Sequence, residues 1–167
     1  MDTRRGEVAV RTADPGELDQ LARVWYDGWQ DAHAAIVPAE LTRLRTLESF
    51  RLRLHADLQQ IRVVGPIGDP AAFTIVKGDE LYQLFVAAPA RGSGVAVALI
   101  DDAEARLAAS GVATAWLAGA IGNESAARFY EKRGWHRAAT VVNTLQTTSG
   151  TFLLDVWRYE KKLQPRV

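Results

Sequence analysis

The sequence of 167 residues contains no cysteine, no long run of apolar residues and no excess of charge of either sign. The lack of cysteine excludes a disulfide framework, a thiolate metal site and a covalent cysteine intermediate. The 20 basic and 20 acidic residues cancel and are not grouped by sign, so neither a nucleic-acid surface nor a membrane surface is expected. We therefore expect a small-molecule partner.

Two further absences concern location and metal binding. No segment is long and apolar enough to span a membrane, and no apolar run follows the charged start of the chain. That start contains Asp2, Arg4, Arg5 and Glu7. We expect no export and hence a cytoplasmic protein. The 3 histidines share no metal-ligand spacing, so no metal is expected: His33, His55 and His136.

The length and the hydrophobic share of 48% suit one domain with a sizeable core, which we place over residues 1–167. Hydrophobic periodicity and turn residues predict an ordered series of elements. The series is a strand near 8–12, helices over 15–36 and 41–58, strands at 61–64, 71–76 and 81–86, a helix ending near 110, a strand at 113–117, a helix over 123–134, and strands at 135–146 and 151–162. The strand–helix–strand crossover predicts a parallel pair within a mainly antiparallel sheet.

The helix predicted over 41–58 rests on a stripe of leucines that follows Pro38. Its arginines fall between these leucines, and we expect them to form a solvated face: Arg43, Arg45, Arg51 and Arg53.

The most informative stretch begins where the apolar strand 81–86 runs into a glycine-rich turn and then a helix. Gly92 and Gly94 can take backbone angles closed to other residues, so consecutive amides can converge at the helix N-terminus and hold a phosphate. A P-loop is excluded because Val95 and Ala96 stand where it needs Lys and Ser or Thr. A dinucleotide fingerprint fits poorly because a third glycine is missing. A simple tight turn without a ligand stays open.

Together with a downstream helix, this loop resembles the GCN5-related N-acetyltransferases, the GNAT family. The family's loop has Arg or Gln, two residues, Gly, one residue, then Gly or Ala, and its helix has an Asn followed by a Tyr and then by Gly and an aromatic residue. The matching residues are Arg91, Gly94 and Ala96 in the loop, and Asn123, Tyr130, Gly134 and Trp135 in the helix. The resemblance is specific over residues 80–137 and extends by element order to nearly the whole chain.

The resemblance implies a single α/β domain with a mixed, mostly antiparallel, splayed sheet of about seven strands flanked by about four helices. It also implies acetyl-CoA as the cosubstrate, with the pantetheine arm in the gap between two splayed strands, lined by Leu84, Phe85 and Val86. The pyrophosphate would rest on the loop: Arg91, Gly92, Ser93, Gly94, Val95 and Ala96. By family analogy we also expect a homodimer.

Two residues at the start of the 123–134 helix are further candidates for cofactor binding. Asn123 can cap its own helix, contact the pantetheine, or do both with different ends of its side chain. Ser125 can reach the cofactor or be simply solvated.

Tyr130 is the predicted catalytic acid. Attack of an amine on a thioester expels a thiolate, and thiols have a pKa of about 8.5 while phenols have one of about 10, so a nearby phenol can protonate the leaving sulfur. Such proton transfer typically contributes about 10²–10⁴-fold in rate. The alternative is a tyrosine packed beside Phe129 with its hydroxyl in water.

The general base is less apparent from the sequence. An alkyl amine with a pKa of about 10.4 must lose a proton before it attacks. Many family members carry a Glu on the strand before the second motif, but Ala118 stands there in this chain. Glu80 is the predicted replacement, directly or through a water, unless it is only an exposed carboxylate beside a turn. His33 is a second candidate, or else a surface or capping residue.

The first helix borders the acceptor site in the family, so it supplies candidates for binding the acceptor. Its aromatic residues, Trp25, Tyr26 and Trp29, are expected to belong mostly to the core, with one available to an apolar or cationic acceptor. We assign Trp29, His33 and Glu80 to the acceptor side. The expected reaction is direct acetyl transfer to a primary amine of a small molecule, with a peptide or protein amine left open. A non-catalytic acyl-CoA sensor and a nucleotide-binding module are the alternatives.

Overall fold

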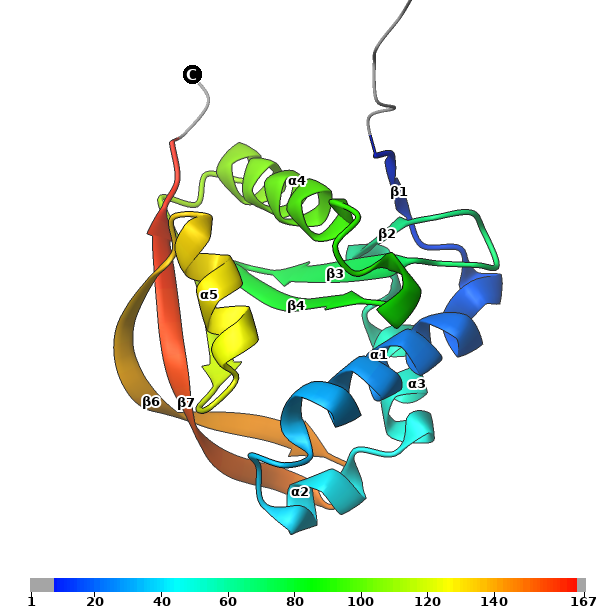
Figure 1. The fold of residues 1–167 in the computed structure, drawn as a ribbon, viewed down its shortest axis with the longest axis vertical. Coiled ribbons are helices and arrows are strands. Elements are labelled where there is room, and N and C mark those ends of the chain that lie inside the picture. Colours follow the sequence, from blue (N-terminus) through cyan, green and yellow to red (C-terminus); the bar gives the residue numbers. More distant parts are fainter. Residues whose placement is uncertain (1–7, 165–167) are drawn as a thin grey trace, which may run out of the picture.

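The computed structural model describes residues 8–164 and contains a 7-stranded sheet with the order β1-β2-β3-β4-β5-β7-β6 (Figure 1). Its strands are β1 (Val10–Thr12), β2 (Ile61–Val64), β3 (Ala72–Lys77), β4 (Glu80–Val86), β5 (Thr114–Ala120), β6 (His136–Thr147) and β7 (Gly150–Lys162). β4 and β5 pair in parallel, and the other neighbours in this part of the chain are antiparallel. The predicted mixed, mostly antiparallel sheet is confirmed. The charged residues 2–7 lie outside the described range.

Helices cover both faces of this sheet (Figure 1). They are α1 (Leu18–His33), α2 (Ala39–Leu44), α3 (Leu47–Ala56), α4 (Val95–Ala109) and α5 (Glu124–Lys132). A 3-10 turn, Pro15–Glu17, leads into α1, and Asp14 caps this turn by accepting from the Gly16 amide at 2.8 Å. Across residues 8–164, no helix combines the length and apolar character needed to cross a membrane.

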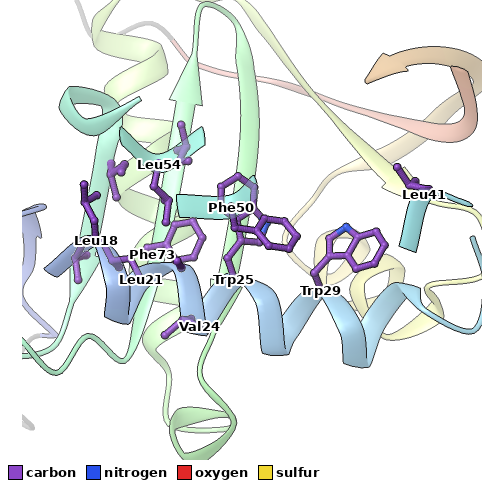
Figure 2. Packing of buried hydrophobic residues seen from close by; sticks show 13 residues of the cluster. Leu18, Leu21, Val24, Trp25, Trp29, Leu41, Phe50, Leu54 and Phe73 are labelled. Carbon is purple, nitrogen blue, oxygen red and sulfur yellow. The ribbon is translucent and has the colours of Figure 1, made fainter. Parts of the chain in front are cut away.

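The core on the α1 and α3 side is built around aromatic residues (Figure 2). The Trp25 ring is fully buried, with its centre 4.8 Å from that of Phe50 and 5.6 Å from that of Phe73. Burying such a ring contributes roughly 1.5–3 kcal/mol. Farther along α1, a Cβ added to Gly28 would lie 2.7 Å from the Phe85 ring, so glycine is needed for this close approach of α1 to β4.

The prediction of one helix over 41–58 is wrong, because a short turn separates two helices, α2 and α3. Thr46 caps α3, its hydroxyl accepting from the Ser49 amide at 3.1 Å. Just before this cap, Arg45 is only 3% exposed and donates to the Gln146 carbonyl oxygen at 2.7 Å, which joins the end of α2 to β6. The predicted solvated face is therefore wrong for Arg45. Arg53 is also half-buried, with its guanidinium 4.3 Å from the centre of the Trp25 ring.

A β-bulge in β4 opens the sheet. Ile75 of β3 faces Gln83, but the next residue, Val76, faces Leu81, so Tyr82 is the extra residue. Bulges bend a strand and increase its twist. The parallel register between β4 and β5 is correspondingly limited to Glu80 opposite Trp116. Beyond this pair the two strands diverge, and a wedge opens toward their carboxyl ends.

Candidate active site

A cleft of about 950 Å³ occupies the wedge between β4 and β5. Its lining includes Tyr82 and Phe85, which pack against the core beneath α1 and α3. It also includes Leu84 and Tyr130, which pack against the core beneath α4 and α5. The cleft therefore gives access to both faces of the sheet.

The glycine loop forms one end of the cleft. Gly92 has a φ of 78° and Gly94 has a φ of 90°, in the left-handed region that favours glycine, and Gly94 is the N-cap of α4. A Cβ added at either glycine would meet nothing within 4 Å, so the space in front of the loop is open. Five consecutive or near-consecutive amides here have no hydrogen-bond partner among the described residues: Gly92, Gly94, Val95, Ala96 and Val97.

The predicted phosphate cradle is wrong at two of its backbone amides. The amide of Arg91 donates to the Ala88 carbonyl at 3.3 Å, and that of Ser93 donates to the Ala90 carbonyl at 3.2 Å. The Ser93 hydroxyl also donates to the Ala90 carbonyl, and Ser93 is outside the cleft lining. These bonds hold the loop in shape, while the amides available to a ligand extend one residue further into α4.

The Arg91 side chain spans the mouth of the cleft. Its Nη2 lies 3.2 Å from Oδ2 of Asp31 on α1, and both residues line the cleft. Half of the Arg91 side chain is exposed, so this ion pair is accessible to solvent and to a competing anion.

The start of α5 forms the opposite wall. The Asn123 Oδ1 accepts from the Ala126 amide at 3.3 Å, so the capping alternative is confirmed, and the side-chain NH₂ is left for a further contact. Asn123 and Ser125 both line the cleft.

The position of Tyr130 is fixed by the end of α5. The Gly134 amide donates to the Glu131 carbonyl at 3.1 Å, and the Trp135 amide donates to the Tyr130 carbonyl at 3.0 Å, which together form a Schellman motif. Gly134 has the required positive φ of 90°. The centres of the Trp135 and Tyr130 rings lie 6.3 Å apart, and this pair adds the hydrophobic contact that accompanies the motif. The Gly and Trp of the sequence motif thus hold the tyrosine against the cleft.

Burial raises the pKa of the Tyr130 hydroxyl well above its ordinary value. The phenol is therefore neutral throughout the neutral range and is a hydrogen-bond donor toward the cleft.

Glu80 lies at the closed end of the wedge, one residue outside the cleft lining. Burial raises the pKa of its carboxyl to about 7, an effect that Lys77 opposes, Asp79 reinforces and Arg158 opposes. A carboxyl with this pKa is about half ionised at neutral pH, which suits a proton acceptor.

His33 ends α1 and lines the cleft, whereas Trp29 is buried in the core and is outside the lining. The His33 Nδ1 lies 3.2 Å from the Trp29 carbonyl oxygen, an acceptor, so Nδ1 carries the proton and the Nε2 lone pair is free. Burial lowers the pKa of His33 to about 4, and the ring is neutral at neutral pH. The assignment of Trp29 to the acceptor side is therefore wrong as a direct contact.

Sequence reasoning missed several residues of the lining: Asp31, Tyr82, Gln83, Val97 and the β5 run Leu117–Ala120. Tyr82 and Gln83 enter the cleft through the bulge, for which the sequence carries no local signal. Gly28 within a helical pattern was a usable signal, because an isolated glycine there indicates a close approach.

The fold agrees with comparisons to known proteins. The sequence model of the acetyltransferase (GNAT) family matches residues 63–135, while no curated protein matches the chain in sequence. A GCN5-related N-acetyltransferase from Rhodopseudomonas palustris is 22% identical, with a TM-score of 0.74, and the match covers 95% of this chain and 97% of the other.

Two further solved structures contain a bound coenzyme. PaiA N-acetyltransferase from Thermoplasma acidophilum, in complex with coenzyme A, is 17% identical with a TM-score of 0.62, covering 92% of this chain and 98% of that one. A phosphinothricin acetyltransferase from Sinorhizobium meliloti, in complex with acetyl-CoA, is 14% identical with a TM-score of 0.68, covering 96% of this chain and 94% of that one.

A 7-stranded mixed sheet that splays after β4, with a glycine loop at its open edge, is the fold of the N-acetyltransferases. The sequence match over residues 63–135 is to the GNAT acetyltransferase family, and the fold of the described chain is the one that these solved acetyltransferases share.

Proposed function

We propose that this protein transfers an acetyl group directly from acetyl-CoA to a primary amine of a small molecule. The observation that carries the proposal is the cleft between β4 and β5, which has unbonded amides at one end and the neutral Tyr130 phenol in its wall. A binding site for a diphosphate and a proton donor for a thiolate are thereby joined in one cavity.

The residues of the cleft fit acetyl-CoA. The amides of Gly92, Gly94 and the first turn of α4 point a partial positive charge into open space, which suits a pyrophosphate. The β4 edge beyond Glu80 has no register with β5, so backbone groups of residues 84–86 are available to the amide-containing pantetheine arm. When bound, acetyl-CoA supplies the activated acetyl thioester.

Tyr130 acts on the leaving group. The amine nitrogen forms a bond to the thioester carbonyl carbon, and the carbon–sulfur bond breaks as the tetrahedral intermediate collapses. The departing sulfur takes a proton or a hydrogen bond from the Tyr130 hydroxyl, which burial keeps neutral.

Glu80 is the better candidate for removing the proton of the amine. Its pKa of about 7 is close to the working pH, whereas the His33 pKa of about 4 makes that imidazole a weak base. The His33 Nε2 lone pair can instead accept a hydrogen bond from the amine and orient it. Because Glu80 lies just outside the lining, a water between it and the amine completes the transfer.

A test of this function measures thiol release from acetyl-CoA with a broad panel of amines, together with the acetyl-CoA Kd by calorimetry. The expected result is thiol release that requires an amine, with an N-acetylated product in the mass spectrum. Acetyl-CoA binding without amine-dependent release would indicate a sensor instead. Tight binding of ATP or NAD and none of coenzyme A would indicate a nucleotide-binding module.

A further inference from the structure

Two cations contact Tyr82 in the cleft wall. Arg53 of α3 donates from Nη2 to the Tyr82 hydroxyl oxygen at 2.7 Å. Lys77, at the end of β3, places its Nζ 4.0 Å from the centre of the Tyr82 ring. Arg45 directly follows α2 and is buried. Burial lowers its pKa to about 10, and the charge of Arg53 is the second cause.

The positive charge of this corner is only partly neutralised. Lys77 pairs with Asp57 at 2.8 Å. Within residues 8–164, neither Arg45 nor Arg53 pairs with a carboxylate: Arg45 donates to a carbonyl oxygen and Arg53 to a phenol. Partly buried cations without a counter-charge cost stability, and two neighbouring guanidinium groups also repel.

Packing accounts for the position of these arginines but leaves their charge uncompensated. The Arg53 guanidinium stacks 4.3 Å from the Trp25 ring centre, an arrangement that contributes roughly 0.5–2 kcal/mol. The Arg45 bond to Gln146 fastens β6 to α2. The cation–π contact uses the charge of Arg53 without neutralising it, and the bond from Arg45 to a carbonyl oxygen does not require a full charge, so the net charge of this corner suits an anion that enters the cleft.

The hydroxyl of Tyr82 retains a hydrogen that it can donate to that anion. Its oxygen accepts from Arg53, so its own hydrogen is free, and Tyr82 lines the cleft. Glu80 lies two residues earlier along β4, a separation of at most about 7 Å along the strand. That spacing suits a small molecule with an amine at one end and an acid at the other.

We propose that the acceptor is a small amine that carries a carboxylate, with its carboxylate against the Tyr82 hydroxyl and its amine toward Glu80. Arg53 positions Tyr82 and supplies charge behind it, and Arg45, almost fully enclosed, adds to that positive field. The acceptor class is therefore short amino acids and close analogues. This inference rests on the proposed acetyl transfer to an amine.

The experiment compares each amino acid with its own carboxamide, in which the acid becomes a neutral amide and the amine is retained. Measured by thiol release, kcat/KM is expected to favour the acid by about tenfold or more, mainly through KM, because a charge-assisted bond is lost in the amide. Tyr82→Phe and Arg53→Gln are expected to reduce this acid-to-amide ratio several-fold, and Arg53→Lys to retain part of it.

Arg51→Gln is the matched control, because Arg51 lies on the same helix but points to solvent and pairs with Asp19 at 2.8 Å. It is expected to leave the ratio unchanged, and the acetyl-CoA Kd is expected to stay the same in every variant. Tyr82→Phe keeps the test decisive if Arg53→Gln fails to fold.

Two outcomes separate the inference from the function on which it rests. Equal turnover of acids and amides, or an unchanged ratio in Tyr82→Phe, would overturn the inference and leave acetyl transfer standing. If acetyl-CoA binds but no amine of either series is acetylated, acetyl transfer fails and the inference fails with it.

Discussion

The two halves of the cleft are built by different means. The half assigned to acetyl-CoA comes from one continuous stretch, residues 84–135, and consists mainly of backbone: open amides, glycines with positive φ and a Schellman turn. The half assigned to the acceptor consists of side chains from distant segments, joined by bonds such as Arg53 to Tyr82 and Arg45 to Gln146.

This difference shows why one half is readable in the sequence and the other is not. Backbone geometry depends on a few glycines and caps at fixed spacing, and those residues leave a local pattern. Side-chain chemistry depends on which segments the fold brings together. The cosubstrate is therefore inferred from a motif, whereas the acceptor must be inferred from charge and geometry.

Tyr130→Phe has the largest expected effect, because it removes the proton donor at the junction of the two halves. We expect kcat to fall about 10²-fold or more while the acetyl-CoA Kd stays within a small factor, measured by thiol release and calorimetry. Tyr159→Phe is the matched control, since it deletes a hydroxyl from a buried ring 6.3 Å away. Equal losses in both variants would show that Tyr130 acts through packing.

Glu80→Gln tests the acceptor half through the pH dependence of the reaction rate. The Glu80 carboxylate is the basic form, so activity should rise as pH rises through about 7, and this limb of the pH–rate profile should disappear in the variant. A loss of about tenfold or more at neutral pH is expected. Glu40→Gln, at an exposed position on α2, is the control. An unaltered profile in Glu80→Gln would remove Glu80 from the mechanism.

The same substitution has a consequence for stability. The folded-state pKa of Glu80 lies above its ordinary value of 4.5, so the protonated carboxyl favours the folded state. That contribution is present below about pH 4.5 and is lost as pH rises through about 7. Urea unfolding should therefore show the wild type losing stability relative to Glu80→Gln across this range. Parallel pH curves for the two proteins would contradict the raised pKa.

Gly94→Ala tests the backbone character of the cosubstrate half. A left-handed conformation costs a residue with a Cβ roughly 1–2 kcal/mol, and relieving that strain turns the loop amides away, so the acetyl-CoA Kd should rise about tenfold. Gly150→Ala imposes the same kind of strain at the β6–β7 turn, with a φ of 100°. Both variants should lose similar stability, and only Gly94→Ala should lose affinity. Retained affinity in Gly94→Ala would contradict the cradle.

Asp31→Asn has the smallest expected effect. An exposed ion pair contributes roughly 0.2–1 kcal/mol, so freeing Arg91 for the pyrophosphate should tighten acetyl-CoA binding by no more than a few-fold, and less at high salt. Asp27→Asn is the control, because Asp27 pairs with Arg23 outside the cleft. Weaker binding in Asp31→Asn would mean that Asp31 assists the cosubstrate rather than competing with it.

Much of the fold was predictable from local patterns. The first helix was predicted to begin at residue 15, and the capping bonds of Asp14 are present there. The antiparallel meander of β2, β3 and β4 and the parallel crossover to β5 are confirmed. The break between α2 and α3 was missed, because the leucine stripe continues through it and the turn at Arg45 depends on Gln146, far away in the sequence.

The candidate site was predictable to the extent that it follows from the motifs. The glycine conformations and the Asn123 cap agree with the sequence reading. The engaged amides of Arg91 and Ser93, the buried Trp29 and the Tyr82 corner depend on the turn before the loop, the α1 packing and the bulge, which have no local signature. The homodimer stays a prediction.

The sheet order has a consequence for biosynthesis. β7 lies between β5 and β6 and pairs with both. Both β5 and β6 are therefore synthesised before the strand with which they pair. A nascent chain that has not reached residue 150 exposes two unsatisfied strand edges, a state prone to association with other chains. Closure of this side of the sheet therefore waits for β7 and follows the synthesis of both of its neighbours.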